Sequence, residues 1–214
     1  MTISMPRMNR LPAQERGVTI GDFLVPIRVS ERLHNRARHL ALILLGTLLI
    51  TLCARIYIVV PGNPVPFTGQ TFGVLLAAGA LGFRRGVAAT ALYLLLGLWL
   101  PVYAEGRHGV EVLYGATGGY LIGFVVASAI VGRLAELGWD RNLVGGIGAM
   151  LIGSAAIYAL GVPWLAYVAF EGDLSAAVAA GLVPFLLWDA VKVTLAAATF
   201  PAAWWFVGRR PGDR

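Results

Sequence analysis

The sequence predicts an all-α, polytopic membrane protein with six transmembrane helices and with both termini in the cytoplasm. Composition supports the class: 58% of the 214 residues are hydrophobic and 13% are charged. A soluble domain carries about a quarter charged residues. The mean hydropathy is +0.75. These values exclude a soluble fold and a disordered chain, and the arrangement of apolar runs and arginines predicts the number and direction of the helices.

The first 39 residues form a basic segment that holds prolines and no uninterrupted apolar stretch. Since no apolar core follows the charged start, we expect a retained cytoplasmic tail over 1–39 rather than a signal peptide. Its arginines are Arg7, Arg10, Arg16, Arg28, Arg32, Arg36 and Arg38. We expect them to fix the orientation of the chain, and contact with anionic lipid headgroups is the alternative role.

Six apolar runs follow the tail and predict a membrane domain over 40–208, with a cytoplasmic tail over 209–214. The runs cover 40–60, 70–82, 86–100, 117–137, 143–169 and 181–207. A helical crossing needs roughly 20 apolar residues, so the second and third runs are short. The segment 82–86 separates them. We therefore expect these two runs to form a hairpin that packs against the other helices.

The arginines indicate the direction of the six helices. With six crossings, one side of the membrane holds both tails, Arg84, Arg85, Arg133 and Arg141. The opposite side holds only Arg55 and Arg107. Because cytoplasmic segments collect positive charge, the termini are predicted to lie inside. The net charge of +6 then reflects topology and not nucleic-acid binding.

A charged pair lies in the middle of the sixth run. Lys192, the only lysine of the chain, follows Asp189 by three residues, so both side chains lie on one helix face. Each charge near the bilayer centre costs roughly 2.5 to 3.5 kcal/mol on insertion scales, which demands compensation. A ligand site is the favoured interpretation, and a structural ion pair that closes a helix contact is the main alternative. A proton relay fits less well, since no other acidic residue or histidine lies in mid-span.

The sequence lacks the motifs of several other function classes. It has no histidine pair at helical spacing within the spans, no G-x-x-x-x-G-K-[ST] loop and no G-x-S-x-G pattern. Cys53 is the only cysteine, so the chain forms no internal disulfide. We therefore expect no metal, no cofactor and no enzymatic activity, and any ATP-driven step requires other subunits.

Four ordered segments resemble the BioY family, the biotin-specific S components of energy-coupling-factor transporters. They are VPFTGQT at 65–71, LGFRRG at 81–86, YLLLGLWLPVYA at 93–104 running on to GATGGYLIGF at 115–124, and VPFLLWDAVK at 183–192. The resemblance covers about residues 54–200. The family usually has glycine at the positions of Trp99 and Trp188, and proline at that of Ala116.

The resemblance implies a multi-pass protein of the cell inner (plasma) membrane that captures biotin from outside. Its further partners are membrane lipid, an energy-coupling transmembrane subunit and two ATPase subunits. An S component for another vitamin and a stand-alone ion-coupled small-molecule carrier are the alternatives.

The same resemblance implies a set of substrate-binding residues. Asp189 and Lys192 offer an acceptor and a cation to the ureido ring and carboxylate of biotin. Gly118 and Gly119 let their helix approach the ligand, and Tyr120 supplies an aromatic wall. Thr68 and Gln70 lend polar contacts from a loop that closes as a lid, although a role in loop structure is equally open for both.

Overall fold

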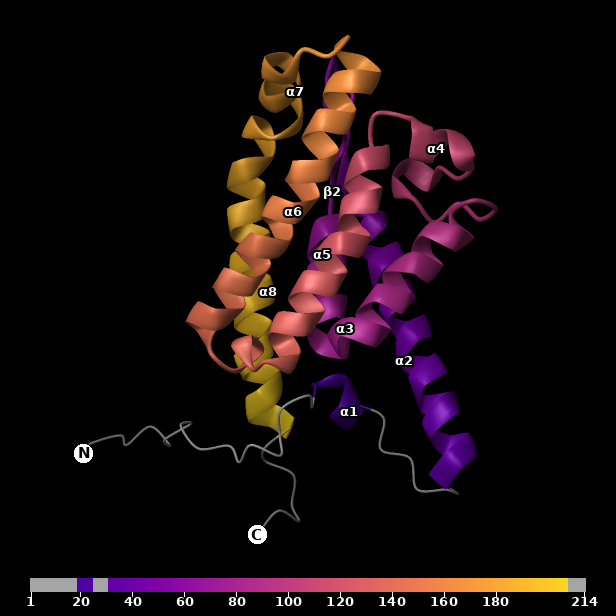
Figure 1. Cartoon of the computed structure of the whole chain (residues 1–214), viewed down its shortest axis with the longest axis vertical. Coiled ribbons are helices and arrows are strands. Elements are labelled where there is room, and N and C mark those ends of the chain that lie inside the picture. The colour runs from indigo at the N-terminus through magenta and orange to yellow at the C-terminus, as the bar shows by residue number, and fades with distance from the viewer. Residues whose placement is uncertain (1–18, 25–30, 208–214) are drawn as a thin grey trace, which may run out of the picture.

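The computed structural model describes residues 19–24 and 31–207, and helices dominate them (Figure 1). The elements are α1 (Gly21–Leu24), α2 (Glu31–Ala54), β1 (Tyr57–Ile58), β2 (Phe67–Thr68), α3 (Gln70–Leu96), η2 (Ala104–Gly106), α4 (Val110–Tyr114), α5 (Gly118–Glu136), η3 (Trp139–Arg141), α6 (Leu143–Ala169), α7 (Leu174–Gly181), η4 (Val183–Phe185) and α8 (Leu186–Val207). Strands β1 and β2 pair antiparallel, with Tyr57 opposite Thr68. The predicted all-α membrane class is confirmed.

Helix α3 folds back on itself at Gly82, where φ is 80° and ψ is −177°. A Cβ atom on Gly86 would lie 2.9 Å from the Cα atom of Ala78, so the two arms are in close contact next to the turn. Figure 1 shows this V-shaped course. A positive φ of this size suits glycine, which has no Cβ atom. The chain therefore contains the hairpin predicted from the second and third apolar runs.

Among the residues that the structure describes, five helical segments are long and apolar enough to cross a membrane. They are Arg36–Ala54, Gln70–Leu96, Gly118–Glu136, Leu143–Ala169 and Leu174–Trp204. Each arm of α3 is roughly 20 Å long at 1.5 Å per residue, whereas the hydrocarbon core is about 30 Å thick. The count of six crossings thus stays a prediction that depends on counting the arms of α3 as two passes.

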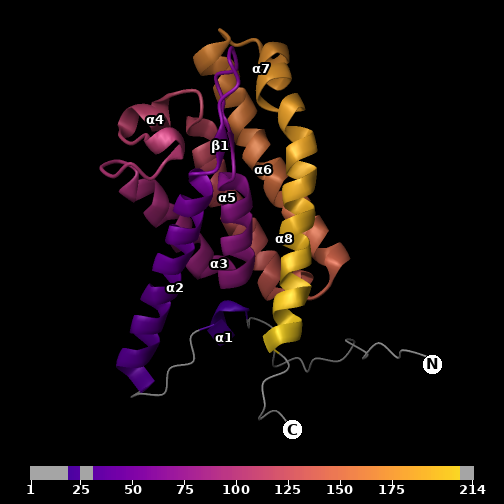
Figure 2. The ribbon, with the colours of Figure 1, turned by 180° about the vertical axis from the view of Figure 1, so that it is seen from behind.

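The two ends of the bundle carry different elements. The start of α2, the turn of α3, η3 and the end of α8 lie at one end, and β1, β2, α4 and α7 lie at the other (Figures 1 and 2). Because the start of α2 and the end of α8 lie at the same end, the chain crosses the bundle an even number of times. The cytoplasmic location of the first end remains a prediction. The basic tail over 1–18 and 25–30 and the tail over 209–214 lie outside the described residues.

The helices differ from the predicted apolar runs at three places. The run 40–60 contains α2 only as far as Ala54, and the apolar residues after it enter β1, which β-branched and aromatic side chains favour. The run 181–207 is interrupted at η4, where Pro184 interferes with a continuous helix. Helix α2 also begins at Glu31, within the segment predicted as a tail.

Glycines on α5 bring its neighbours close. A Cβ atom on Gly123 would lie 2.9 Å from the Cα atom of Ile157 in α6, and one on Gly132 would lie 2.7 Å from the backbone of Gly82 in α3. Small residues permit such close packing of membrane helices. This face therefore packs within the chain, and it places α5 between α3 and α6.

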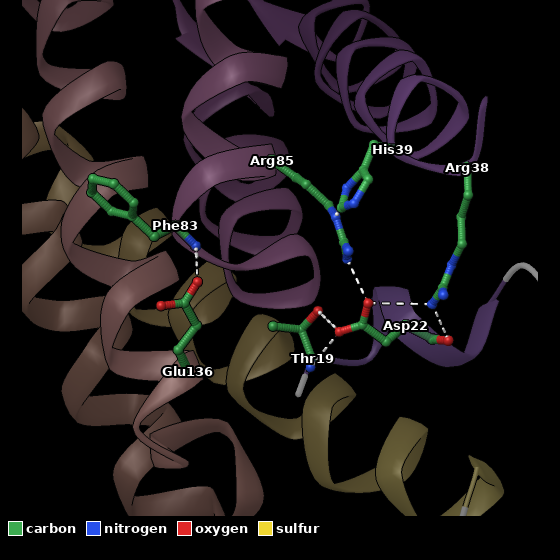
Figure 3. A network of polar contacts seen from close by, with 7 residues as sticks. All are labelled: Thr19, Asp22, Arg38, His39, Phe83, Arg85 and Glu136. Carbon is green, nitrogen blue, oxygen red and sulfur yellow. Dashed lines mark hydrogen bonds and ion pairs between the residues drawn. The ribbon is translucent and has the colours of Figure 1, made fainter. Parts of the chain in front are cut away.

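A polar network ties α1 to α2 and to the turn of α3 (Figure 3). The carboxylate of Asp22 accepts hydrogen bonds from the backbone N–H and the hydroxyl of Thr19, at 3.0 and 3.2 Å. It also pairs with Arg85 at 2.8 Å and Arg38 at 3.2 Å. Burial raises the pKa of Asp22, but the hydrogen bonds from Thr19 and Arg85 outweigh it, and the net pKa lies below its usual value.

We expect Asp22→Asn to lower stability in a pH-dependent manner. Because the folded pKa is depressed, the stabilisation by the carboxylate is present above the pKa of an unfolded aspartate, about 3.9, and is lost as the pH falls through the folded pKa. At neutral pH the partly exposed ion pairs contribute about 1 kcal/mol. In detergent, the unfolding temperature of the parent should exceed that of the variant at pH 7, and this difference should become smaller below about pH 4. A difference that does not change with pH would contradict this assignment.

Candidate ligand-binding site

A cavity opens at the end of the bundle that carries β2, α4 and α7. It contains about 650 Å³ of empty space when its open mouth is included. Side chains from β2, the start of α3, α5, α6 and α8 line it, together with the loop between α3 and α5. The hairpin of α3 and the close packing of α5 on α6 bring these segments together.

A cluster of charged and hydroxyl groups lies on the α8 side of the cavity. The Asp189 side chain forms an ion pair with Lys192, with 3.0 Å between Oδ1 and Nζ. Lys192 also donates to the hydroxyl of Thr71 at 3.1 Å, and Tyr158 donates to Oδ2 of Asp189 at 2.5 Å. Asp189 is only 7% exposed. The partners compensate its burial, and the cluster still faces the cavity.

Aromatic rings form much of the remaining wall. Tyr120 lies edge-on to Tyr158, with 6.1 Å between ring centroids, and its hydroxyl donates to the carbonyl of Gly181 at 2.9 Å. Phe185 stacks on Phe67 at 4.2 Å. Such rings offer apolar surface to a ligand and hold their own orientation through these contacts. Tyr120 therefore lies on the wall of the cavity, and its contact with a ligand stays a prediction.

Thr68 and Gln70 also line the cavity. The amide of Gln70 donates to the hydroxyl of Tyr93 at 2.6 Å, and the backbone N–H of Gln70 donates to the hydroxyl of Thr68 at 3.3 Å. Both side chains thus organise the start of α3 as well as facing the cavity. Closure of their loop over a ligand remains a prediction.

Gly118 and Gly119 were predicted as substrate-binding residues, but they do not line the cavity, whereas Thr117 and Tyr120 beside them do. A Cβ atom on Gly119 would lie 2.3 Å from the Cβ of Trp164 and 2.6 Å from the carbonyl oxygen of Leu160. One on Gly118 would lie 1.8 Å from the carbonyl oxygen of Leu113. These glycines allow α5 to approach α6 and α4, which is a packing role.

The comparison with protein families decides the assignment. The model of the BioY family matches residues 27–209, most of the chain. The chain belongs to the BioY family. Its spans and its relatives make it a multi-pass protein of the plasma membrane.

Curated relatives and a solved structure agree with this assignment. The biotin transporter BioY of Thermotoga maritima is 41% identical over 142 residues, which cover 66% of this chain and 82% of the relative. The probable biotin transporter BioY of Pyrococcus horikoshii is 36% identical, over 75% of this chain and 93% of the relative. The crystal structure of an S-component for biotin from an ECF-type ABC transporter has a TM-score of 0.73 at 24% identity, covering 82% of this chain and 94% of that one. At this identity the structural match shows the fold.

Sequence reasoning missed several residues that line the cavity of this BioY family member. Tyr158 lies 31 residues before Asp189, and a tyrosine inside an apolar run was its only signal. Glu105 and Arg107 come from the loop before α4 and line the cavity with exposed side chains. Glu105 has a φ of 60°, an uncommon backbone conformation for a residue with a side chain.

Tyr103 fixes the loop that carries these two residues. It is buried, and its hydroxyl donates to the carbonyl of Leu94 at 2.7 Å. Burial raises the pKa of Tyr103 to about 12, so the phenol stays protonated and keeps this donor at neutral pH. A Cβ atom on Gly97 would lie 2.1 Å from the Tyr103 ring, so only a glycine fits beneath it. The loop is therefore held against the end of α3.

Proposed function

We propose that this protein binds biotin in the cavity and serves as the substrate-binding component of a biotin uptake system. The observation that carries the proposal is the Asp189–Lys192–Thr71–Tyr158 cluster, which faces the cavity in a member of the BioY family. Relatives named as biotin transporters, among them the one from Thermotoga maritima, support the choice of ligand.

The cavity complements both polar ends of biotin. The ureido ring has two N–H donors and one carbonyl acceptor, and the cluster supplies an acceptor in Asp189 and donors in Lys192 and Thr71. Asp189 already compensates the charge of Lys192. Arg107, by contrast, forms no ion pair with any residue that the structure describes. We therefore place the ureido ring at Asp189 and the carboxylate at Arg107, with the aromatic walls around the apolar part.

Transport itself requires further subunits in this proposal. The similar solved structure is that of an S-component for biotin from an ECF-type ABC transporter, and this chain contains no phosphate-binding loop for ATP. We infer that an energy-coupling transmembrane subunit and two ATPase subunits work with it. The chain then has no catalytic step of its own and contributes the ligand site.

We expect Arg107→Gln to weaken the binding of biotin by about ten- to a hundredfold, which is the value of one bond between charged groups. Biotin amide, which lacks the negative charge, should lose a similar factor on the parent protein. On the variant, biotin amide should bind as tightly as biotin, because the change of residue and the change of ligand remove the same contact. Isothermal titration of both ligands on both proteins measures this coupling. If the change of residue and the change of ligand instead weaken binding independently, so that their two factors multiply, the carboxylate lies elsewhere in the cavity.

A further inference from the structure

A second cavity lies on the side of the bundle, next to the ligand cavity. This side groove runs between β1, the start of α3 and the first turns of α8, and Figure 2 shows β1 in the space between α2 and α8. Its empty space is about 790 Å³, including the open side. Ile56, Ile58, Phe72, Trp188, Val191 and Leu195 supply most of its apolar lining.

The side groove is continuous with the surface that faces the bilayer. Trp188, Val191 and Leu195 follow one another along α8 and are 51%, 49% and 56% exposed. They lie within Leu174–Trp204, one of the segments that can span a membrane. Since the protein is a multi-pass membrane protein, exposed apolar side chains on this segment contact lipid. Trp188, which differs from the usual family residue, therefore lines the side groove and not the ligand cavity.

The walls of the side groove suit a hydrocarbon chain better than a helix. Membrane helices associate through small residues that let their backbones approach. The side groove is instead lined by bulky isoleucine, phenylalanine, leucine and aromatic side chains. Its glycine, Gly69, is already covered, since a Cβ atom there would lie 2.6 Å from the carbonyl oxygen of Cys53. A flexible acyl chain can follow such an uneven apolar surface.

We propose that the side groove binds one acyl chain of a membrane phospholipid and that this chain completes the wall of the ligand site. Thr68 and Lys192 line both the side groove and the ligand cavity, so single side chains separate lipid from ligand. A bound acyl chain excludes water from this side of the Asp189–Lys192 pair. Charged interactions are stronger where water is excluded. The effect on biotin affinity rests on the proposed function, whereas the lipid site does not.

Filling the side groove tests the proposal. Leu195→Trp places a large ring in the side groove, and Leu187→Trp is the matched control because Leu187 lies on the same helix, is 76% exposed and lines neither cavity. Each protein is reconstituted with dioleoylphosphatidylglycerol, extracted in mild detergent and examined by native mass spectrometry. We expect the parent and Leu187→Trp to retain one phospholipid, and Leu195→Trp to retain at least tenfold less. Equal retention by all three proteins would overturn the lipid site.

Biotin binding tests the coupling between the two cavities. Removal of the retained phospholipid should weaken the binding of biotin by the parent severalfold, and its return should restore the affinity. The biotin affinity of Leu195→Trp should not change when lipid is removed or returned. If Leu195→Trp fails to fold, Val191→Phe fills less of the side groove and replaces it in both experiments. If the parent protein binds biotin with the same affinity with and without the phospholipid, the coupling is overturned. Loss of a dimer or of a bound protein from Leu195→Trp, without loss of lipid, would assign the side groove to a protein partner and overturn the proposal.

Discussion

The combined replacement Asp189→Asn and Lys192→Met is expected to lower the affinity for biotin by about ten- to a hundredfold for each lost bond to a charged group. The two changes together nearly preserve side-chain volume and remove both charges of the ion pair. Neither charge is then left alone, so the variant should stay folded and monodisperse in detergent. Equilibrium binding to the purified protein measures the loss.

Single variants separate the role of the pair in binding from its role in folding. Lys192→Met alone leaves the carboxylate of Asp189 buried, with the Tyr158 hydroxyl as its one remaining partner among the described residues, and should be less stable than the double variant. Tyr158→Phe keeps the ion pair and removes one donor. It should therefore weaken binding by a smaller factor than the double variant. Unchanged affinity in the double variant would show that the pair is a structural tether and that biotin binds elsewhere.

The replacement Gly119→Ala is expected to destabilise the fold by about 1–3 kcal/mol, which is typical of overpacking. Its new methyl group would overlap the Trp164 side chain and the Leu160 carbonyl, and the backbone of α6 cannot move aside freely. Gly146→Ala is the matched control because its methyl group would meet Ala197 at 3.4 Å, an ordinary contact. It should be neutral or slightly stabilising, because alanine has a higher helix propensity than glycine. Thermal unfolding of the two variants in detergent compares them.

The same comparison tests the revised role of this glycine. A contact with the ligand would make Gly119→Ala lose biotin affinity while the unfolding temperature stays that of the parent. A packing role lowers the unfolding temperature and leaves the affinity of the folded fraction close to that of the parent. The second pattern is the one that the position of Gly119 against α6 predicts.

Apolar runs with clear ends were predictable from sequence. Helix α6 covers 143–169 as expected, because Asn142 caps its start by accepting from the backbone of Gly145 and because the polar turn after Ala169 ends the run. The end of α2 was not predictable in this way. The apolar run continues beyond Ala54 into β1, and hydrophobicity alone does not separate a short strand from a helix.

In the site, too, some residues were predictable from the sequence and others depend on how the helices pack. Asp189 and Lys192 stood out because charges are costly inside an apolar run, and the structure places both on the cavity wall. Tyr158 lies on α6, and its bond to Asp189 depends on how α6 packs against α8, which the sequence does not reveal. Gly118 and Gly119 were recognised as small residues, but their neighbours decide whether small size serves a ligand or a helix. Here the neighbours are Leu113, Leu160 and Trp164.

The central claim is that this cavity binds biotin, and the most direct measurement is equilibrium binding to the purified chain alone. Biotin and other water-soluble vitamins are titrated in parallel into protein in lipid nanodiscs. We expect saturable binding of one biotin per chain, with affinity reduced in the Asp189→Asn, Lys192→Met double variant, and no saturable binding of the other vitamins. Saturable binding of another vitamin with none of biotin would contradict the claim.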